Sequence, residues 1–142
     1  RPAARPLMFL LSHHHPAEYH RTYRVGPVRL CARCLGTYPV MAAGIALQFA
    51  LGAPLAHPAD PFLALALTLP ALLDWATGRF RPHAGSNLLR SATGVLLGIS
   101  LARTLFVHLQ RPFHLWLLLQ AGLVTAVALP VILATYRRRR GV

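Results

Sequence analysis

The first quarter of the chain contains both cysteines and four histidines upstream of them. Cys31 and Cys34 are separated by two residues, a spacing at which two thiolates can bind one tetrahedral metal ion. One or two histidines would complete the site, and we expect His13 together with His20 or His14 to be the remaining ligands. The pattern predicts a zinc site. A closed site would serve scaffolding or partner docking, and an open one would allow metal-assisted chemistry.

Two other interpretations of the cysteine pair remain open. C-x-x-C is also the spacing of exchange-active dithiols, which would make the protein a membrane thiol oxidoreductase that works with a quinone or a partner thiol. The cysteines can also be ordinary buried thiols. Arg29 and Arg33 are expected to lower the thiol pKa values. Leu35 follows the motif where the haem-attachment sequence C-x-x-C-H would require histidine, so that motif is absent.

A second group of polar residues follows further along the chain. Asp74 and Arg90 are ionisable residues at the edge of apolar stretches, where such groups are costly unless they are paired. Ser86 or Asn87 can cap a helix that starts there, and Thr93 shares a helix face with Arg90. We expect either an Asp74–Arg90 ion pair that holds two helices together or a polar pocket for an anionic head group or substrate. The pocket would make the protein a transporter or a lipid-head-group binder built around Asp74 and Arg90.

The composition of the whole chain indicates what positions these side chains. Of its 142 residues, 55% are hydrophobic and 13% are charged, and the mean hydropathy is +0.47. A soluble domain usually carries about 25% charged residues, and a disordered chain is poor in apolar residues. Both classes are therefore excluded, and apolar spans that cross a bilayer explain the numbers.

Four apolar stretches approach the length of about 17–25 residues that a membrane helix needs. They cover residues 37–56, 59–77, 88–109 and 113–136, and Pro70 is expected to kink the second. The expected fold is an all-α integral membrane protein, an up-down-up-down bundle in which successive helices are neighbours. Residues 1–36 would form a cytoplasmic or interfacial Cys-His segment, and residues 137–142 a basic tail.

The arginines indicate the orientation of this bundle. Thirteen of the fifteen lie in the three regions that a four-span topology places on one side, which predicts an inner-membrane protein with both termini in the cytoplasm. Arg103 lies near the other side and is expected to snorkel to the surface. The net charge of +12 is thus explained by arginines that orient the spans in the membrane. The expected partners are the lipid bilayer and anionic lipid head groups, and a nucleic acid is not expected.

Small residues along the predicted helices would allow close helix packing. Gly94 and Gly98 form a G-x-x-x-G pair, and Gly36 lies at the start of the first span. The pattern leaves open whether these faces meet within one chain, in a homo-oligomer or against another membrane protein.

The quoted motifs resemble those of the small prokaryotic membrane proteins in domain-of-unknown-function family 2085. The matching residues are His13-x-x-Pro16, Cys31-Ala32-Arg33-Cys34-Leu35-Gly36-Thr37-Tyr38, Asp74, Gly78 and Ser86-Asn87-x-x-Arg90-x-x-Thr93-Gly94. Many members carry Cys-His at the first element, where this chain has Ser12-His13, so one potential thiolate is missing. The resemblance implies a membrane protein and important motifs, and it implies no established activity.

Overall fold

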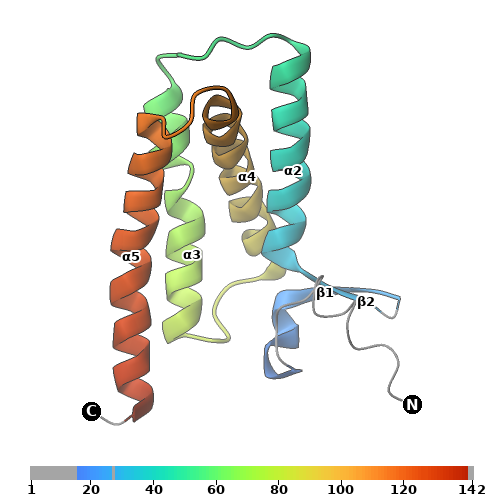
Figure 1. Cartoon of the computed structure of the whole chain (residues 1–142). Helices are drawn as coiled ribbons and strands as arrows, with labels where there is room; N and C mark the ends of the chain where they lie inside the picture. The colour runs from blue at the N-terminus through green and yellow to red at the C-terminus, as the bar shows by residue number, and fades with distance from the viewer. Residues whose placement is uncertain (1–15, 27, 141–142) are drawn as a thin grey trace.

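The computed structural model describes residues 16–26 and 28–140, and it is mostly helical (Figure 1). A 3-10 helix, η1, leads into an antiparallel hairpin in which Thr22 pairs with Cys31. Four long helices follow, the second of which is preceded by a short π-helical turn, η2. The elements are η1 (Pro16–Arg21), β1 (Thr22–Val25), β2 (Val28–Cys31), α2 (Ala32–Ala50), η2 (Phe62–Ala66), α3 (Leu69–Phe80), α4 (Asn87–Gln110) and α5 (Leu115–Arg140).

The first helix lies earlier in the sequence than its apolar stretch suggests. α2 begins directly after Cys31, so the polar residues Arg33 and Cys34 belong to its first turn. It ends before Gly52, whose φ of +59° is a left-handed conformation that favours glycine. The expected span of residues 37–56 is therefore shifted toward the N-terminus, and the C-x-x-C motif lies at a helix start.

The second helical column is interrupted before Pro70, as the sequence predicts. The π-helical turn η2 ends at Ala66, and α3 starts at Leu69 with the proline in its first turn. Proline has no N–H and its ring crowds the preceding helical turn, which favours a break before Pro70. Proline alone does not force one, since Pro39 and Pro130 lie inside the continuous helices α2 and α5. α3 then runs through Gly78 to Phe80.

The closest helix contact joins α2 to α4, which run parallel to each other. A Cβ atom on Gly36 would lie 2.3 Å from the Ser91 carbonyl oxygen. One on Gly94 would lie 2.5 Å from the Arg33 carbonyl oxygen, and one on Gly98 would lie 2.7 Å from that of Thr37. The three glycines therefore let two backbones touch, as the small-residue pattern predicts. The contact lies within one chain, a point that the pattern left open.

The expected order of neighbouring helices is wrong for α2. The long helices alternate in direction, but the connection that follows α2 crosses over the end of α4 before the chain descends through η2 and α3 (Figure 1). α2 consequently packs chiefly on α4, while α5 packs on α3 and η2.

Two of the described helices are long and apolar enough to cross a membrane, Asn87–Gln110 and Leu115–Arg138. About half of the first is buried inside the molecule, whereas only a small part of the second is. Gln120 is the one buried residue among the described side chains of α5, and its amide donates to the hydroxyls of Thr68 at 2.8 Å and Ser100 at 2.7 Å. A polar contact thus attaches this helix to its neighbours.

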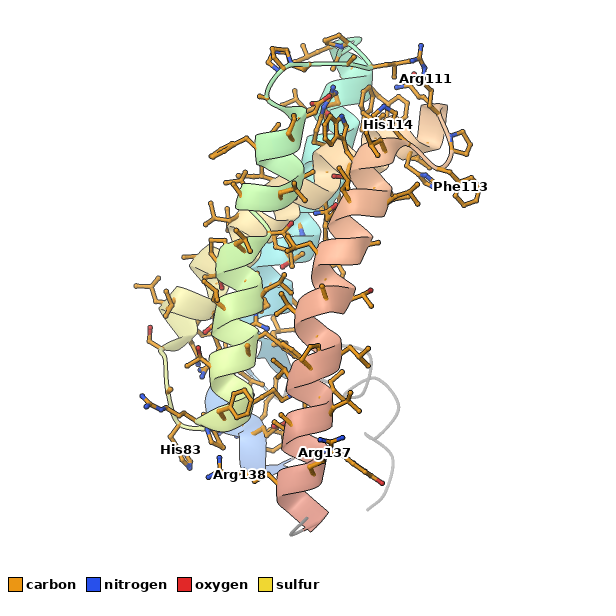
Figure 2. The ribbon with its side chains drawn as sticks, turned by 90° about the vertical axis from the view of Figure 1, so that its left-hand side faces the viewer. His83, Arg111, Phe113, His114, Arg137 and Arg138 are labelled. Atoms are coloured by element: carbon orange, nitrogen blue, oxygen red, sulfur yellow. The ribbon has the colours of Figure 1, made fainter. Side chains whose placement is uncertain are left out.

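The two ends of the molecule differ in charge. One end, here called the basic end, holds the hairpin, the α3–α4 connection and the end of α5 (Figure 1). His83, Arg137 and Arg138 lie there, whereas Arg111 and His114 lie at the opposite end (Figure 2). The described arginines that the sequence placed on one side of the bundle therefore do lie together at one end of the molecule.

Candidate functional site

Hydrogen bonds fasten the N-terminal segment to the basic end. Arg21 Nη2 donates to the carbonyl oxygen of Gly78 at 2.7 Å and to that of Pro82 at 3.0 Å. Asn87 Nδ2 donates to the carbonyl oxygen of Thr22 at 3.2 Å. These contacts bring η1 and the hairpin against the α3–α4 connection, so the cysteine segment and the second polar group of the sequence meet.

Asp74 forms its ion pair with Arg33, which corrects the expected pairing with Arg90. Arg33 Nη2 contacts Asp74 Oδ2, and the Asp74 side chain is only 8% exposed. Arg90 is buried, and it donates to the carbonyl oxygen of Ala84 at 2.6 Å and to Asn87 Oδ1 at 3.2 Å. The close packing of α2 on α4 places Arg33 next to Asp74. The acceptors for Arg90 are Ala84, in the α3–α4 connection, and Asn87, at the start of α4.

The other expected residues of the polar pocket support its backbone. Ser86 caps α4, because its hydroxyl accepts a hydrogen bond from the Leu89 N–H at 3.2 Å. Thr93 is buried, and its hydroxyl donates to the carbonyl oxygen of Arg90 at 3.1 Å. The structure therefore brings Asp74, Asn87 and Arg90 together and uses Ser86 and Thr93 within α4.

Three arginines and the carboxylate of Asp74 lie close together at the basic end. Arg21, Arg33 and Asp74 are all close enough to Arg90 to influence its charge. Asp74 Oδ1 and Arg90 Nη2 both lie near Gly85, at 3.5 and 3.8 Å from where its Cβ would be. We call Arg21, Arg33 and Arg90 the arginine cluster.

The arginine cluster has more hydrogen-bond donors than acceptors. In the described part of the chain, Arg21 Nε and Arg33 Nε are buried without an acceptor. Glu18 approaches Arg21 at 3.9 Å, the outer limit of an ion pair, and its side chain is 43% exposed. The sequence analysis did not identify Arg21 as a site residue, and it considered Arg33 only as a neighbour of the cysteines. The position of Arg33 inside the C-A-R-C motif was the signal that could have identified it.

The two cysteines lie side by side where β2 meets α2, before the apolar part of the helix. Cys31 is buried and Cys34 is partly exposed. A hydrogen bond to the Cys31 thiol, burial and the charge of that sulfur raise the pKa of the Cys34 thiol, and Arg33 offsets them only in part. Arg29 lies 4.2 Å over the Tyr19 ring. Arg33 lowers the pKa of the Cys34 thiol as expected, but the other causes outweigh it, so the expectation of a net lowered pKa is wrong for Cys34.

The predicted metal ligands are only partly within the described residues. His20 Nε2 lies 2.8 Å from the Pro82 carbonyl oxygen, and its ring is 5.1 Å from that of His83. Across residues 16–26 and 28–140, no three side chains of His, Cys, Asp or Glu gather closely enough to hold an ion. His13 and His14 lie outside the described residues, so their part in the site stays a prediction.

A second ion pair lies toward the opposite end of the bundle. Arg103 Nε donates to Asp60 Oδ1 at 2.7 Å and Arg103 Nη2 to Asp60 Oδ2 at 3.0 Å. Gln48 Oε1 accepts from Arg103 Nη1 at 3.3 Å, and the Asp60 side chain is 2% exposed. The expectation that Arg103 snorkels to the surface is wrong. Its guanidinium is buried in an ion pair with Asp60, which lies in the connection that crosses over α4.

These features define a helical membrane protein with a densely basic end. Comparison with known families is more specific: residues 14–104 match the model of family DUF2085, described as predicted membrane proteins. Because the match covers more than half of the chain, the protein belongs to this family. No curated protein and no solved structure matches the chain.

Proposed function

We propose that this protein binds the anionic head group of a membrane lipid at the arginine cluster. The excess of guanidinium donors is the observation that carries the proposal. Guanidinium groups bind phosphate oxygens in a planar, two-pronged geometry, and partial burial strengthens the interaction because water screens it less. Two buried Nε atoms without an acceptor in the described chain are places where ligand oxygens would complete the hydrogen bonding.

The proposed setting is a four-span protein of the inner membrane with the basic end in the cytoplasm. α4 and α5 have spanning length and composition. α2, with 19 residues, and the column formed by η2 and α3 run beside them. The arginines of the hairpin, the α3–α4 connection and the tail would then lie at the cytoplasmic head groups, as the positive-inside rule expects. Anionic lipids are enriched in that leaflet, which supports a lipid as the ligand.

Lipid binding by one matched pair of variants tests this proposal. We expect Arg21→Gln to reduce the affinity of the detergent-solubilised full chain for phosphatidylglycerol about tenfold, because a charge-assisted hydrogen bond is worth about 1.5–3 kcal/mol. Arg24→Gln removes the same charge from the exposed hairpin, where Arg24 bonds to the Gly26 carbonyl oxygen. Native mass spectrometry would count the bound lipids.

Equal losses of lipid in the two variants would contradict the proposal, since general attraction to a basic surface would then explain the binding. Phosphatidylcholine is the control lipid, and it should bind equally to all three proteins. Circular dichroism on each variant shows whether Arg21→Gln keeps the fold, because Arg21 also bonds to Gly78 and Pro82.

Zinc binding at the cysteines is a second candidate function. The close contact of the Cys31 and Cys34 thiols at the start of α2 supports it, because the C-x-x-C spacing presents both sulfurs to one ion. His13 or His14 would supply further ligands. A closed site would fasten the N-terminal segment to the bundle and serve scaffolding or partner docking.

Elemental analysis tests the zinc site. We expect about one zinc per purified chain, with Cys31→Ser and Cys34→Ser each abolishing it, because two thiolates provide half of a tetrahedral ligand set. Arg24→Gln should keep the metal. A folded, metal-free wild type would refute the site, and a mass shift on alkylation that depends on prior reduction would instead support a thiol oxidoreductase.

A further inference from the structure

We infer that the arginine cluster selects a phosphate monoester, which carries two negative charges, over a phosphate diester, which carries one. This inference rests on the proposed anion binding and adds the class of the ligand. It follows from the charge that the basic end leaves uncompensated, from the direction of two helices and from the number of unpaired donors.

The charge balance of the cluster is positive even when every nearby acid is included. The cluster holds three guanidinium groups, and Asp74 pairs with Arg33 and interacts electrostatically with Arg90. Glu18 is the one other acid of the sequence at this end of the molecule, since Asp60 lies toward the far end. Glu18 is half-exposed and at the limit of an ion pair, so it compensates Arg21 weakly. At least one full positive charge remains.

Two helix N-termini add to this charge. α2 and α4 run parallel and start side by side, since Ser91 Oγ donates to the Ala32 carbonyl oxygen at 2.9 Å. Each helix terminus is equivalent to roughly half a positive charge. The cluster and the two termini together therefore present a surplus of about two charges, which a dianion would neutralise and a monoanion would not.

The donors and surroundings fit the same ligand. A monoester offers three terminal oxygens and a diester only two, and Arg21 Nε and Arg33 Nε lack acceptors in the part of the chain the structure describes. The Arg33 side chain is 22% exposed, which leaves the cluster within reach of a ligand. Leu88 and Leu89 are exposed beside it at the start of α4, a suitable surface for acyl chains. A free phosphate monoester shares the head-group chemistry.

Competition between matched lipids tests the inference. The full chain in detergent would be titrated with phosphatidate and with phosphatidylglycerol of identical acyl chains at pH 8, with binding followed by native mass spectrometry. We expect phosphatidate to bind at least about tenfold more tightly, because it places one further charge among the guanidinium groups. Arg21→Gln should reduce this preference, and Arg24→Gln should preserve it.

Each other outcome has a distinct meaning. Equal affinity for the two lipids would overturn the inference and leave anion binding intact, whereas failure of both to bind would overturn the proposed function itself. Glycerol 3-phosphate, which has the head group without acyl chains, separates the sources. Displacement of phosphatidate by it at comparable concentration would identify a soluble monoester as the ligand, and weak displacement would identify the lipid.

Discussion

Replacing Asp60 with alanine is expected to destabilise the protein by about 3–5 kcal/mol, because it leaves the buried guanidinium of Arg103 without its carboxylate. Arg103 makes two hydrogen bonds to Asp60 and one to Gln48. Asp60 also accepts from the His57 N–H at 2.9 Å, which ties the crossing connection to the start of η2. Losing one carboxylate therefore unpairs a buried charge and frees the chain segment that crosses α4.

A double variant separates the ion pair from simple loss of packing. Asp60→Ala combined with Arg103→Leu removes both charges, so we expect it to be more stable than Asp60→Ala alone. Arg111→Ala is the control, because Arg111 is an exposed arginine at the same end. Denaturant unfolding in detergent, followed by circular dichroism, gives the free energies. If the single variant loses less than about 1 kcal/mol, or the double variant is no better, the ion pair is not structurally important.

The second large effect is expected at the contact between α2 and α4. Gly94→Leu should destabilise the protein by about 3 kcal/mol, because its Cβ alone would lie 2.5 Å from the Arg33 carbonyl oxygen and backbone atoms cannot move aside independently. The added side chain would separate the helices and displace Arg33 from Asp74. We therefore also expect weaker anion binding.

Gly122→Ala is the matched control for this prediction. Gly122 lies within α5, and apart from the backbone of its own helix and its chain neighbours no described atom comes within 4 Å of where its Cβ would be. Alanine favours a helix over glycine by up to about 1 kcal/mol, so this variant should be unchanged or slightly more stable. A Gly94→Leu protein with wild-type stability would show that α2 and α4 are not in backbone contact.

The sequence predicted well where the helices lie and that most arginines gather at one end of the molecule. Apolar stretches located the four helical columns, Pro70 located the break before α3, and Gly36, Gly94 and Gly98 identified a real packing face. These features depend on local chemistry, such as hydropathy, a missing N–H or a missing side chain. The ends of the helices were predicted less accurately. Helix α2 includes part of the polar C-x-x-C motif, which a search for apolar residues excludes.

The partners of the charged residues were not predictable in the same way. Asp74 and Arg90 are near each other, yet Asp74 binds Arg33, because α2 lies parallel to α4 with their starts adjacent. Asp60 meets Arg103 because the chain crosses over α4. Both outcomes depend on the lateral order of helices, which hydrophobic spacing leaves open when the outer faces of all helices are apolar.

Locating a bound anion tests the central claim most directly. Crystals of the full chain soaked in selenate, a dianion of phosphate-like shape, would reveal its position by anomalous scattering. We predict a selenium peak among Arg21, Arg33 and Arg90, with oxygens within hydrogen-bond distance of the two unpaired Nε atoms. Selenate found only at exposed arginines such as Arg24 or Arg137, with none at the cluster, would contradict it.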